Sequence, residues 1–222
     1  MHDEMNGVNS VNTNKISKFV QRVFLYVMAG FVLVACATGP ALSDKHRPST
    51  WAQPVGNTEL KQELPNLYQV SPVLYRSAQP LAGGLTILNQ HQGAQYGLPA
   101  EIKTVVSLRS DDGDAQWVEP TGVRYEQIPM RAWKVKDKDV KQFLDLVRNP
   151  NNQPVLVHCK HGADRTGVMV AVYRVVEQGW SKGDAIAEMT HGGFGYHTIW
   201  TNLIRYIEDL DVAKFKKTAS PL

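Results

Sequence analysis

The feature that most constrains this sequence is a short apolar strand joined to an apolar helix by a seven-residue loop. Residues 154–158 (PVLVH) form a compact hydrophobic run, and residues 166–176 (TGVMVAVYRVV) are apolar nearly all round. A strand and a helix without a polar face must both be buried, which is typical of the centre of an α/β domain. The sequence therefore predicts a central strand–loop–helix unit, with residues 159–165 (CKHGADR) as the loop.

Hydrophobic patterns predict further strands and helices on both sides of this unit. The helix predicted at 137–148 carries Val140, Phe143, Leu144 and Val147 at the spacing i, i+3, i+4, i+7 of an amphipathic helix. The other expected strands are 67–70, 73–75, 103–108 and 123–128, and the other expected helices are 85–91, 181–189 and 199–210. Strands that alternate with helices predict an α/β sandwich with a largely parallel sheet.

The N-terminus has the layout of a secretory signal. Lys15, Lys18 and Arg22 precede the uncharged apolar run 23–34, which is shorter than the about 20 residues that span a bilayer. The run ends in Leu-Val-Ala-Cys, which resembles the lipobox of bacterial lipoproteins and makes Cys36 the expected lipidation site. We therefore expect a periplasmic, membrane-anchored lipoprotein; the alternative is an uncleaved anchor helix with an incidental cysteine.

These patterns divide the chain into four parts. We expect a signal peptide at 1–35, a tether at 36–66 that is rich in Pro, Ser, Thr and Gln, a folded domain at 67–212, and a polar tail at 213–222. The chain has two cysteines, so lipidation of Cys36 leaves Cys159 without a disulfide partner in the chain. A net charge of +3 gives no reason to expect a nucleic-acid partner, and the oligomeric state is open.

The loop at 159–165 has the physical properties of an anion site. A turn from a strand into a helix directs several backbone N–H groups at one point, where the helix dipole adds positive potential. Gly162 allows the tight turn, and Cys159 at the base of the turn is favoured as a thiolate. Arg165 can chelate two oxygens of a phosphoryl group. We expect Thr166 to offer a hydroxyl to the sulfur and His158 to orient the cysteine from behind.

The order His-Cys, five residues, Arg-Thr resembles the signature of the tyrosine and dual-specificity phosphatases. The segments 74–80 (LYRSAQP), 103–109 (KTVVSLR), 154–162 and 173–194 are similar to the small periplasmic dual-specificity tyrosine phosphatases of Gram-negative bacteria. The resemblance implies a four- to five-stranded sheet flanked by helices, a phosphocysteine intermediate, a phosphoprotein substrate, and no metal or other cofactor.

The resemblance also assigns roles to the residues of the loop. It implies that Cys159 is the nucleophile and that Arg165 grips the phosphoryl group. The residues expected to bind the phosphate are Lys160, His161, Gly162, Ala163 and Thr166. For Lys160 and His161, contact with substrate and a place on the solvated rim are both open.

The sequence departs from the family at the general acid. Family members carry an aspartate in the loop after the strand that ends here at Ile128, but residues 130–134 read MRAWK. Our first candidate is Asp164, because a bound dianion would favour a proton on its carboxyl. Asp137 is the alternative, although capping of its helix is a competing role. Asp139 and the aspartates at 111, 112 and 114 are weaker candidates.

Four other polar residues lie near expected strand or loop ends. We expect Arg76 and Arg109 to form structural ion pairs rather than to act in catalysis. His191 and His197 flank a glycine-rich segment and could form a metal pair, but a simple loop between two helices is the favoured interpretation.

The motif leaves other functions to be tested. The same chemistry could act on an inositol phosphate or a phospholipid headgroup. A rhodanese-like sulfurtransferase also uses a cysteine loop, but it typically has four residues between cysteine and arginine where this chain has five. The last alternative is a phospho-ligand binder without catalysis.

Overall fold

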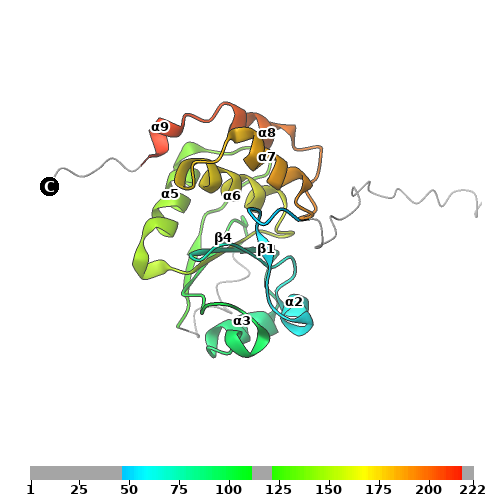
Figure 1. The fold of residues 1–222 in the computed structure, drawn as a ribbon. Coiled ribbons are helices and arrows are strands. Elements are labelled where there is room, and N and C mark those ends of the chain that lie inside the picture. Colours follow the sequence, from blue (N-terminus) through cyan, green and yellow to red (C-terminus); the bar gives the residue numbers. More distant parts are fainter. Residues whose placement is uncertain (1–46, 112–121, 217–222) are drawn as a thin grey trace, which may run out of the picture. The chain divides into compact units, whose positions relative to one another are not determined.

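A six-stranded sheet is the central layer of the computed structural model, which describes residues 47–111 and 122–216 (Figure 1). The strands lie in the order β1-β2-β3-β6-β4-β5. Their bounds are β1 Gln53–Pro54, β2 Tyr68–Ser71, β3 Leu74–Ser77, β4 Thr104–Ser107, β5 Arg124–Gln127 and β6 Val155–His158. Strands β3, β6, β4 and β5 are parallel, whereas β1 and β2 pair antiparallel at one edge. The predicted α/β fold with a largely parallel sheet is confirmed.

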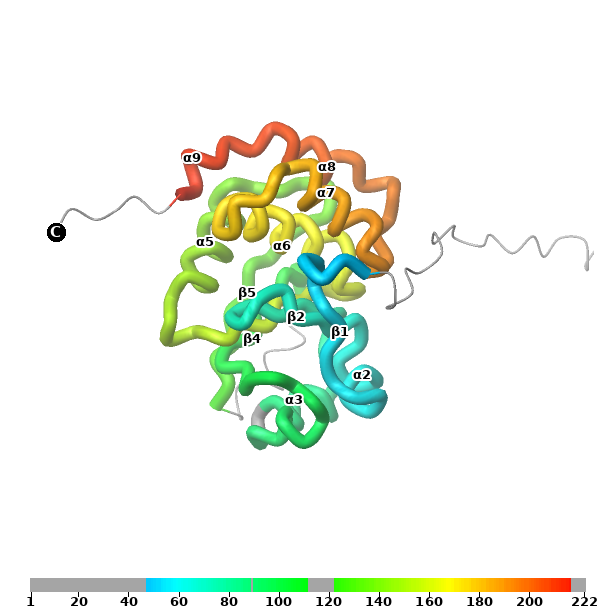
Figure 2. The backbone as a smooth tube through the Cα atoms, viewed as in Figure 1, coloured from blue at the N-terminus to red at the C-terminus, as the bar shows by residue number. Residues whose placement is uncertain are grey.

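Helices cover both faces of the sheet (Figures 1 and 2). One face carries α5 (Asp137–Arg148), α6 (Asp164–Glu177), α7 (Lys182–His191), α8 (Thr201–Glu208) and α9 (Val212–Phe215). The other face carries α2 (Thr58–Glu63) and α3 (Ala82–Asn89). Short 3-10 turns, η2 (Gly93–Tyr96) and η4 (Pro150–Asn152), complete the elements of the described residues.

The central strands are buried on both faces because successive side chains point to opposite sides. On β6, Val155 and Val157 belong to the core beneath α5 and α6, and Leu156 belongs to the core beneath α2 and α3. On β4, Val106 belongs to the core beneath α5 and α6, and Val105 belongs to the core beneath α2 and α3. This double burial explains why both strands are continuous apolar runs in the sequence.

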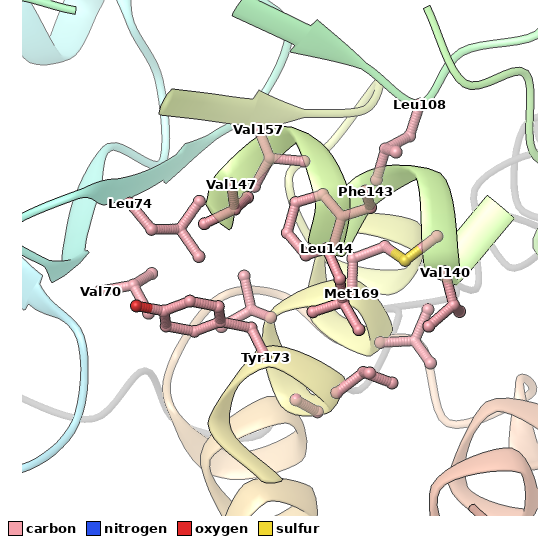
Figure 3. Close-up of a cluster of buried hydrophobic side chains, with 14 of the residues drawn as sticks. Val70, Leu74, Leu108, Val140, Phe143, Leu144, Val147, Val157, Met169 and Tyr173 are labelled. Atoms are coloured by element: carbon pink, nitrogen blue, oxygen red, sulfur yellow. The ribbon is translucent and has the colours of Figure 1, made fainter. Parts of the chain in front are cut away.

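The larger core forms between the sheet and α5 and α6. Figure 3 shows Leu74 and Val157 of the sheet, Phe143 and Leu144 of α5, and Met169 of α6 meeting in one cluster. The predicted apolar positions of α5 are all buried, and α5 has the predicted bounds. Because α6 lies between the sheet and α7 and α8, nearly every residue from Thr166 to Val175 is buried. The core therefore fixes the position of the α6 N-terminus.

The folded domain begins earlier than the sequence predicted. Residues 47–66 were expected to be tether, but Ala52, Leu60 and Leu64 are fully buried, and β1 and α2 lie in this segment. A two-residue strand and a six-residue helix are too short to give a hydrophobic period, so the prediction was wrong for residues 47–66. At the other end, Phe215 of α9 is buried in the core, beyond the predicted boundary at 212.

None of the helices in the two described ranges is long and apolar enough to cross a bilayer. The apolar run at 23–34, the expected tether at 36–46 and Cys36 lie outside these ranges, as do Asp112 and Asp114.

Candidate active site

The predicted anion loop, residues 159–165, joins the carboxyl end of β6 to the N-terminus of α6. We call it the phosphate loop. The parallel strands β3, β4 and β5 end at the same edge of the sheet, and ligands of open parallel sheets bind at such edges. The site is therefore built where the fold class places one.

Donors behind the phosphate loop hold three successive carbonyl groups away from its interior. The bonds run from the Gln79 N–H to Lys160 O (3.3 Å), from Asn66 Nδ2 to His161 O (2.9 Å), and from Arg76 Nη2 to Gly162 O (2.7 Å). In a trans peptide the N–H points opposite to the C=O. The N–H groups of residues 161–163 therefore face the interior of the loop, as the anion-site prediction requires.

Gly162 is required at the tightest point of the loop. Its φ is +69°, a conformation that L side chains rarely adopt. A Cβ on this residue would lie 2.5 Å from the carbonyl carbon and oxygen of Ser77. Both the backbone conformation and the close approach to β3 thus exclude a side chain.

Cys159 lies at the base of the loop, and its side chain is almost completely buried. The Thr166 hydroxyl is also buried and has no hydrogen-bond partner among the described residues, so it is available to a thiolate or a bound anion. The ring of His158 is buried behind the cysteine, with Nδ1 3.4 Å from Cys159 O. These positions agree with the roles expected for Thr166 and His158.

Arg165 is fixed by carbonyl groups at the ends of two neighbouring strands. Its Nη1 donates to Leu108 O (3.2 Å) and to Met130 O (3.3 Å). Leu108 follows β4, and Met130 follows β5, so the sheet itself orients the guanidinium at the cavity. The remaining edge of the planar group, Nε and Nη2, has the geometry to chelate two phosphoryl oxygens.

Arg76 places a buried positive charge behind the loop. Its guanidinium lies over the Phe194 ring (3.6 Å to the centroid) and donates to Gly162 O. Burial lowers the pKa of Arg76 from 12.5 to about 10, while the charges of Glu188 and Cys159 oppose the shift. We expected an ion pair here, but the main contacts are a carbonyl and an aromatic ring. Arg109 does form the expected ion pair, with Asp111.

A cavity of about 690 Å³ opens above the phosphate loop. Its lining residues are Ser110, Met130, Arg131, Ala132, Trp133, Cys159, Lys160, His161, Asp164, Arg165, His197, Ile199 and Trp200. Trp133 and Ile199 are 60% and 76% exposed, which is unusual for large apolar side chains. The cavity therefore has a cationic floor and an apolar rim.

The structure separates the two main candidates for the general acid. Asp164 lines the cavity, where its Oδ1 accepts the His197 N–H (2.9 Å) and its Oδ2 lies 2.8 Å from His197 Nδ1. Asp137 is not among the lining residues; it accepts hydrogen bonds from Lys214 and Tyr206, which lower the pKa of its carboxyl. The geometry therefore favours Asp164 over Asp137 as a participant, and the role itself stays a prediction.

His197 is a site residue whose place the sequence did not predict. His191, which the sequence suggested as a possible metal partner of His197, contacts Thr190 and does not belong to the cluster of side chains around His197. His197 lies near His161 (5.6 Å between ring centroids), and the ligand atoms of His161, Asp164 and His197 fall within 4.8 Å of one another. All three line the cavity. Desolvation, and then the charges of His197 and Lys160, lower the pKa of His161.

Comparison with known proteins identifies the family. A family model described as "DSP-PTPase phosphatase fused to NAD+ Kinase" matches residues 61–201. The dual specificity protein phosphatase TpbA of Pseudomonas aeruginosa is 37% identical over 192 residues, which cover 86% of this chain and 81% of TpbA. The chain belongs to the dual-specificity phosphatases. It is a cysteine-dependent phosphatase, and the sulfurtransferase interpretation is excluded.

Solved structures agree with this assignment. The crystal structure of P. aeruginosa TpbA in complex with phosphotyrosine has a TM-score of 0.62 at 37% identity and covers 77% of this chain and 96% of that chain. The core catalytic domain of the Saccharomyces cerevisiae phosphatase SIW14 shares the fold, with a TM-score of 0.54 at 23% identity over 67% of this chain and 89% of that chain.

Proposed function

We propose that this phosphatase hydrolyses phosphotyrosine in proteins, and phosphoserine and phosphothreonine by the same route, through a phosphocysteine intermediate on Cys159. The observation that carries the proposal is the buried Cys159 at the base of a loop whose three backbone N–H groups face inward. The Cys159 sulfur attacks phosphorus, and the bond from phosphorus to the leaving oxygen breaks. Water then attacks the phosphocysteine, the P–S bond breaks, and inorganic phosphate and the thiolate are released.

Arg165 and the loop amides bind the three oxygens on phosphorus throughout this sequence. In a loose transition state the charge is spread over these oxygens, so fixed donors stabilise it without reorganisation. Arg165 is held in advance by two carbonyl groups of the sheet, and the loop amides are held by the donors behind them. Thr166 supplies a buried hydroxyl to the same centre.

The apolar rim supports an aromatic phosphate ester as substrate. Trp133, Ile199 and Trp200 line the cavity around the cationic floor, which suits a phenyl ring with a phosphate at its tip. The relative TpbA has been crystallised with phosphotyrosine. We therefore place phosphotyrosine before phosphoserine, whose short side chain would not reach the rim.

A second substrate class follows from the basic side chains that line the cavity. Lys160, His161 and Arg131 line the cavity, and such a cluster suits an inositol phosphate or a phospholipid headgroup. A more distant relative, 26% identical over 124 residues, is the inositol diphosphatase SIW14 of Saccharomyces cerevisiae. This class is the alternative to phosphoproteins.

The test is a comparison of kcat/KM for phosphotyrosine peptides, phosphoserine peptides and inositol phosphates in buffer with EDTA. We expect the phosphotyrosine peptides to be the best substrates, and Cys159→Ser to abolish all turnover. A preference for inositol phosphates would assign the second class. Failure of the wild-type protein to release phosphate from any of them would overturn the proposal.

We also propose that the mature protein begins at Cys36 as a lipoprotein with its catalytic domain in the periplasm. The support is the charged leader, the short apolar run and the Leu-Val-Ala-Cys sequence. Expression in a Gram-negative host with a labelled fatty acid should give a labelled, membrane-bound protein. Cys36→Ala should lose the label; a label that persists in this variant would contradict the proposal.

A further inference from the structure

The leaving oxygen of a tyrosine phosphate needs a proton, because a phenolate with a conjugate-acid pKa of about 10 leaves poorly. The wall of the cavity that follows β5 consists of Met130, Arg131, Ala132 and Trp133 and carries no carboxylate. Among the described lining residues, Asp164 carries the only carboxyl group. Within the described part of the cavity, the candidates for the proton donor are therefore Asp164 and the side chain that it contacts.

Both carboxylate oxygens of Asp164 are turned to the same partner. Oδ1 accepts the backbone N–H of His197, and Oδ2 lies at hydrogen-bond distance from the Nδ1 of that residue. The two contacts to one residue hold the carboxyl group and the imidazole together. This arrangement suits an anchor for an imidazole better than a proton donor.

The same two contacts fix the orientation of the His197 ring. With Nδ1 directed at Asp164, the opposite edge of the ring carries Nε2, and the residue lines the cavity with its side chain 48% exposed. The loop that holds it is itself anchored, by Tyr196 Oη donating to Trp200 O (2.6 Å) and by Asn66 donating to Phe194 O (2.9 Å). His197 is thus a positioned imidazole beside the cavity.

We propose that His197 is the general acid and base of this phosphatase and that Asp164 is its positioning residue. The inference rests on the proposed phosphotyrosine hydrolysis. In the first step the imidazolium gives its Nε2 proton to the leaving oxygen as the P–O bond breaks and the S–P bond forms. In the second step the neutral imidazole takes a proton from the attacking water as the P–S bond breaks, which restores the imidazolium and the thiolate.

Several charges face this imidazole and bear on its proton. Asp164 on α6 stabilises the imidazolium, whereas His161, Lys160 and Arg165 of the phosphate loop and Arg131 on the opposite wall oppose it. The negative charges of the Cys159 thiolate and of the substrate dianion stabilise the imidazolium.

The experiment compares pH profiles of His197→Asn, Asp164→Asn and His161→Gln with those of the full-length wild-type protein, in EDTA. The amide of asparagine can replace Nδ1 as the donor to Asp164, but it has no proton to transfer. The substrates are a phosphotyrosine peptide and p-nitrophenyl phosphate, whose leaving group needs no proton. His191→Gln is the control, since that exposed histidine lies on α7 outside the cavity.

For His197→Asn we expect a loss of about 10²- to 10⁴-fold in kcat on phosphotyrosine and a smaller loss on p-nitrophenyl phosphate, for which only hydrolysis of the phosphocysteine needs the imidazole. The decline of the wild-type rate as the pH rises through the imidazole range should disappear in this variant and persist in Asp164→Asn, His161→Gln and His191→Gln. Asp164→Asn should lose less in kcat, and Asp164→Glu should restore part of it.

Three results would overturn the proposal. The first is that the fall of the rate with rising pH disappears only in Asp164→Asn. The second is that this fall disappears in His161→Gln. The third is that it persists in His197→Asn. Each differs from failure of the proposed function, in which the wild-type protein itself would not hydrolyse the phosphotyrosine peptide.

Discussion

At the residue scale, the phosphate loop depends on three donors from residues 66–79, a segment distant from the loop in the sequence. Gln79, Asn66 and Arg76 bind successive loop carbonyls, and only Arg76 carries a charge. A buried donor that is lost leaves its carbonyl unsatisfied, at a cost of about 1–3 kcal/mol. The charge of Arg76 also lies close enough to Cys159 to interact with the thiolate. The inward amides are therefore a property of the surrounding domain and not of the loop sequence alone.

Gly162→Ala should abolish catalysis while the domain stays folded. The added Cβ would meet the Ser77 backbone at 2.5 Å, and backbone atoms cannot move aside as a flexible side chain would. We expect loss of phosphate release and of phosphate protection of Cys159 against iodoacetate, with a native circular dichroism spectrum.

Gly179→Ala is the matched control for this substitution. Gly179 also has a positive φ (+71°), but no atom lies within 4 Å of the position that an added Cβ would take. It should show a strain cost of about 1 kcal/mol and normal activity. Equal activity of the two variants would contradict the steric argument at Gly162.

Asp137→Asn should leave kcat/KM and its pH profile unchanged, because Asp137 lies outside the cavity. Hydrogen bonds from Lys214 and Tyr206 hold the pKa of Asp137 below its usual value. A depressed carboxyl pKa stabilises the fold above the unfolded-state value of about 3.9, and the contribution is lost as the pH falls through the folded-state value. For a half-exposed ion pair the effect on the free energy of unfolding at pH 7 should be below about 1 kcal/mol. A large loss of activity would return Asp137 to the candidates for the general acid.

The sequence predicted the part of the site that is contiguous in the chain. Cys159 and Arg165 lie on one loop, so a single strand–loop–helix pattern indicates both. His197 reaches Asp164 across 33 positions and Asn66 reaches His161 across 95. No local pattern links such residues, because their contact depends on how α7, α8 and the N-terminal segment pack. The glycine-rich segment before His197 was the one signal that marked a constrained loop there.

At the element scale, the predictions succeeded where burial imposes a period. α5 has the predicted bounds because its four apolar residues repeat with the period of the helix. The helix predicted at 181–189 is α7, and Ser181 caps it with its side chain accepting the Asp184 N–H. β1 and α2 were missed because only Leu60 of α2 is buried and β1 is two residues long. Short elements that are held in place by the rest of the domain have too few buried residues to show a hydrophobic period in the sequence.

A buried ion pair joins α6, α7 and the N-terminal segment. Arg174 of α6 binds Glu188 of α7, and the Oε1 of Glu188 also accepts the Ala52 N–H (2.6 Å). Glu188→Gln should lower the free energy of unfolding by about 3–5 kcal/mol, because the buried Arg174 charge loses its counter-charge. Urea denaturation measures this change.

Glu177→Gln provides the comparison, since Glu177 pairs with Arg148 near the surface. We expect a change of about 0–1 kcal/mol there. If the two variants were equally stable, the buried pair would contribute no more to the fold than this partly exposed pair.

At the scale of the whole molecule, the N-terminal segment connects the edge of the sheet to the active site. β1 extends the sheet beside β2, α2 packs on the face opposite α6, and Asn66 bonds to both the phosphate loop and the loop that carries His197. A segment that the sequence suggested was a tether therefore holds two loops of the site in place. Its removal should affect stability and catalysis together.

A chain that begins at Leu67 should consequently be much less stable than one that begins at Thr38. Leu60 and Leu64 are fully buried, and burial of each such side chain contributes about 1.5–3 kcal/mol. Their loss, about 3–6 kcal/mol, is comparable to the 5–15 kcal/mol that stabilises a typical domain. Urea denaturation of the two chains should show a lower midpoint for the shorter one, and its residual activity should fall because Asn66 no longer holds the loops. Equal midpoints would mean that β1 and α2 only cover the domain, and the boundary predicted at Leu67 would then be the functional one.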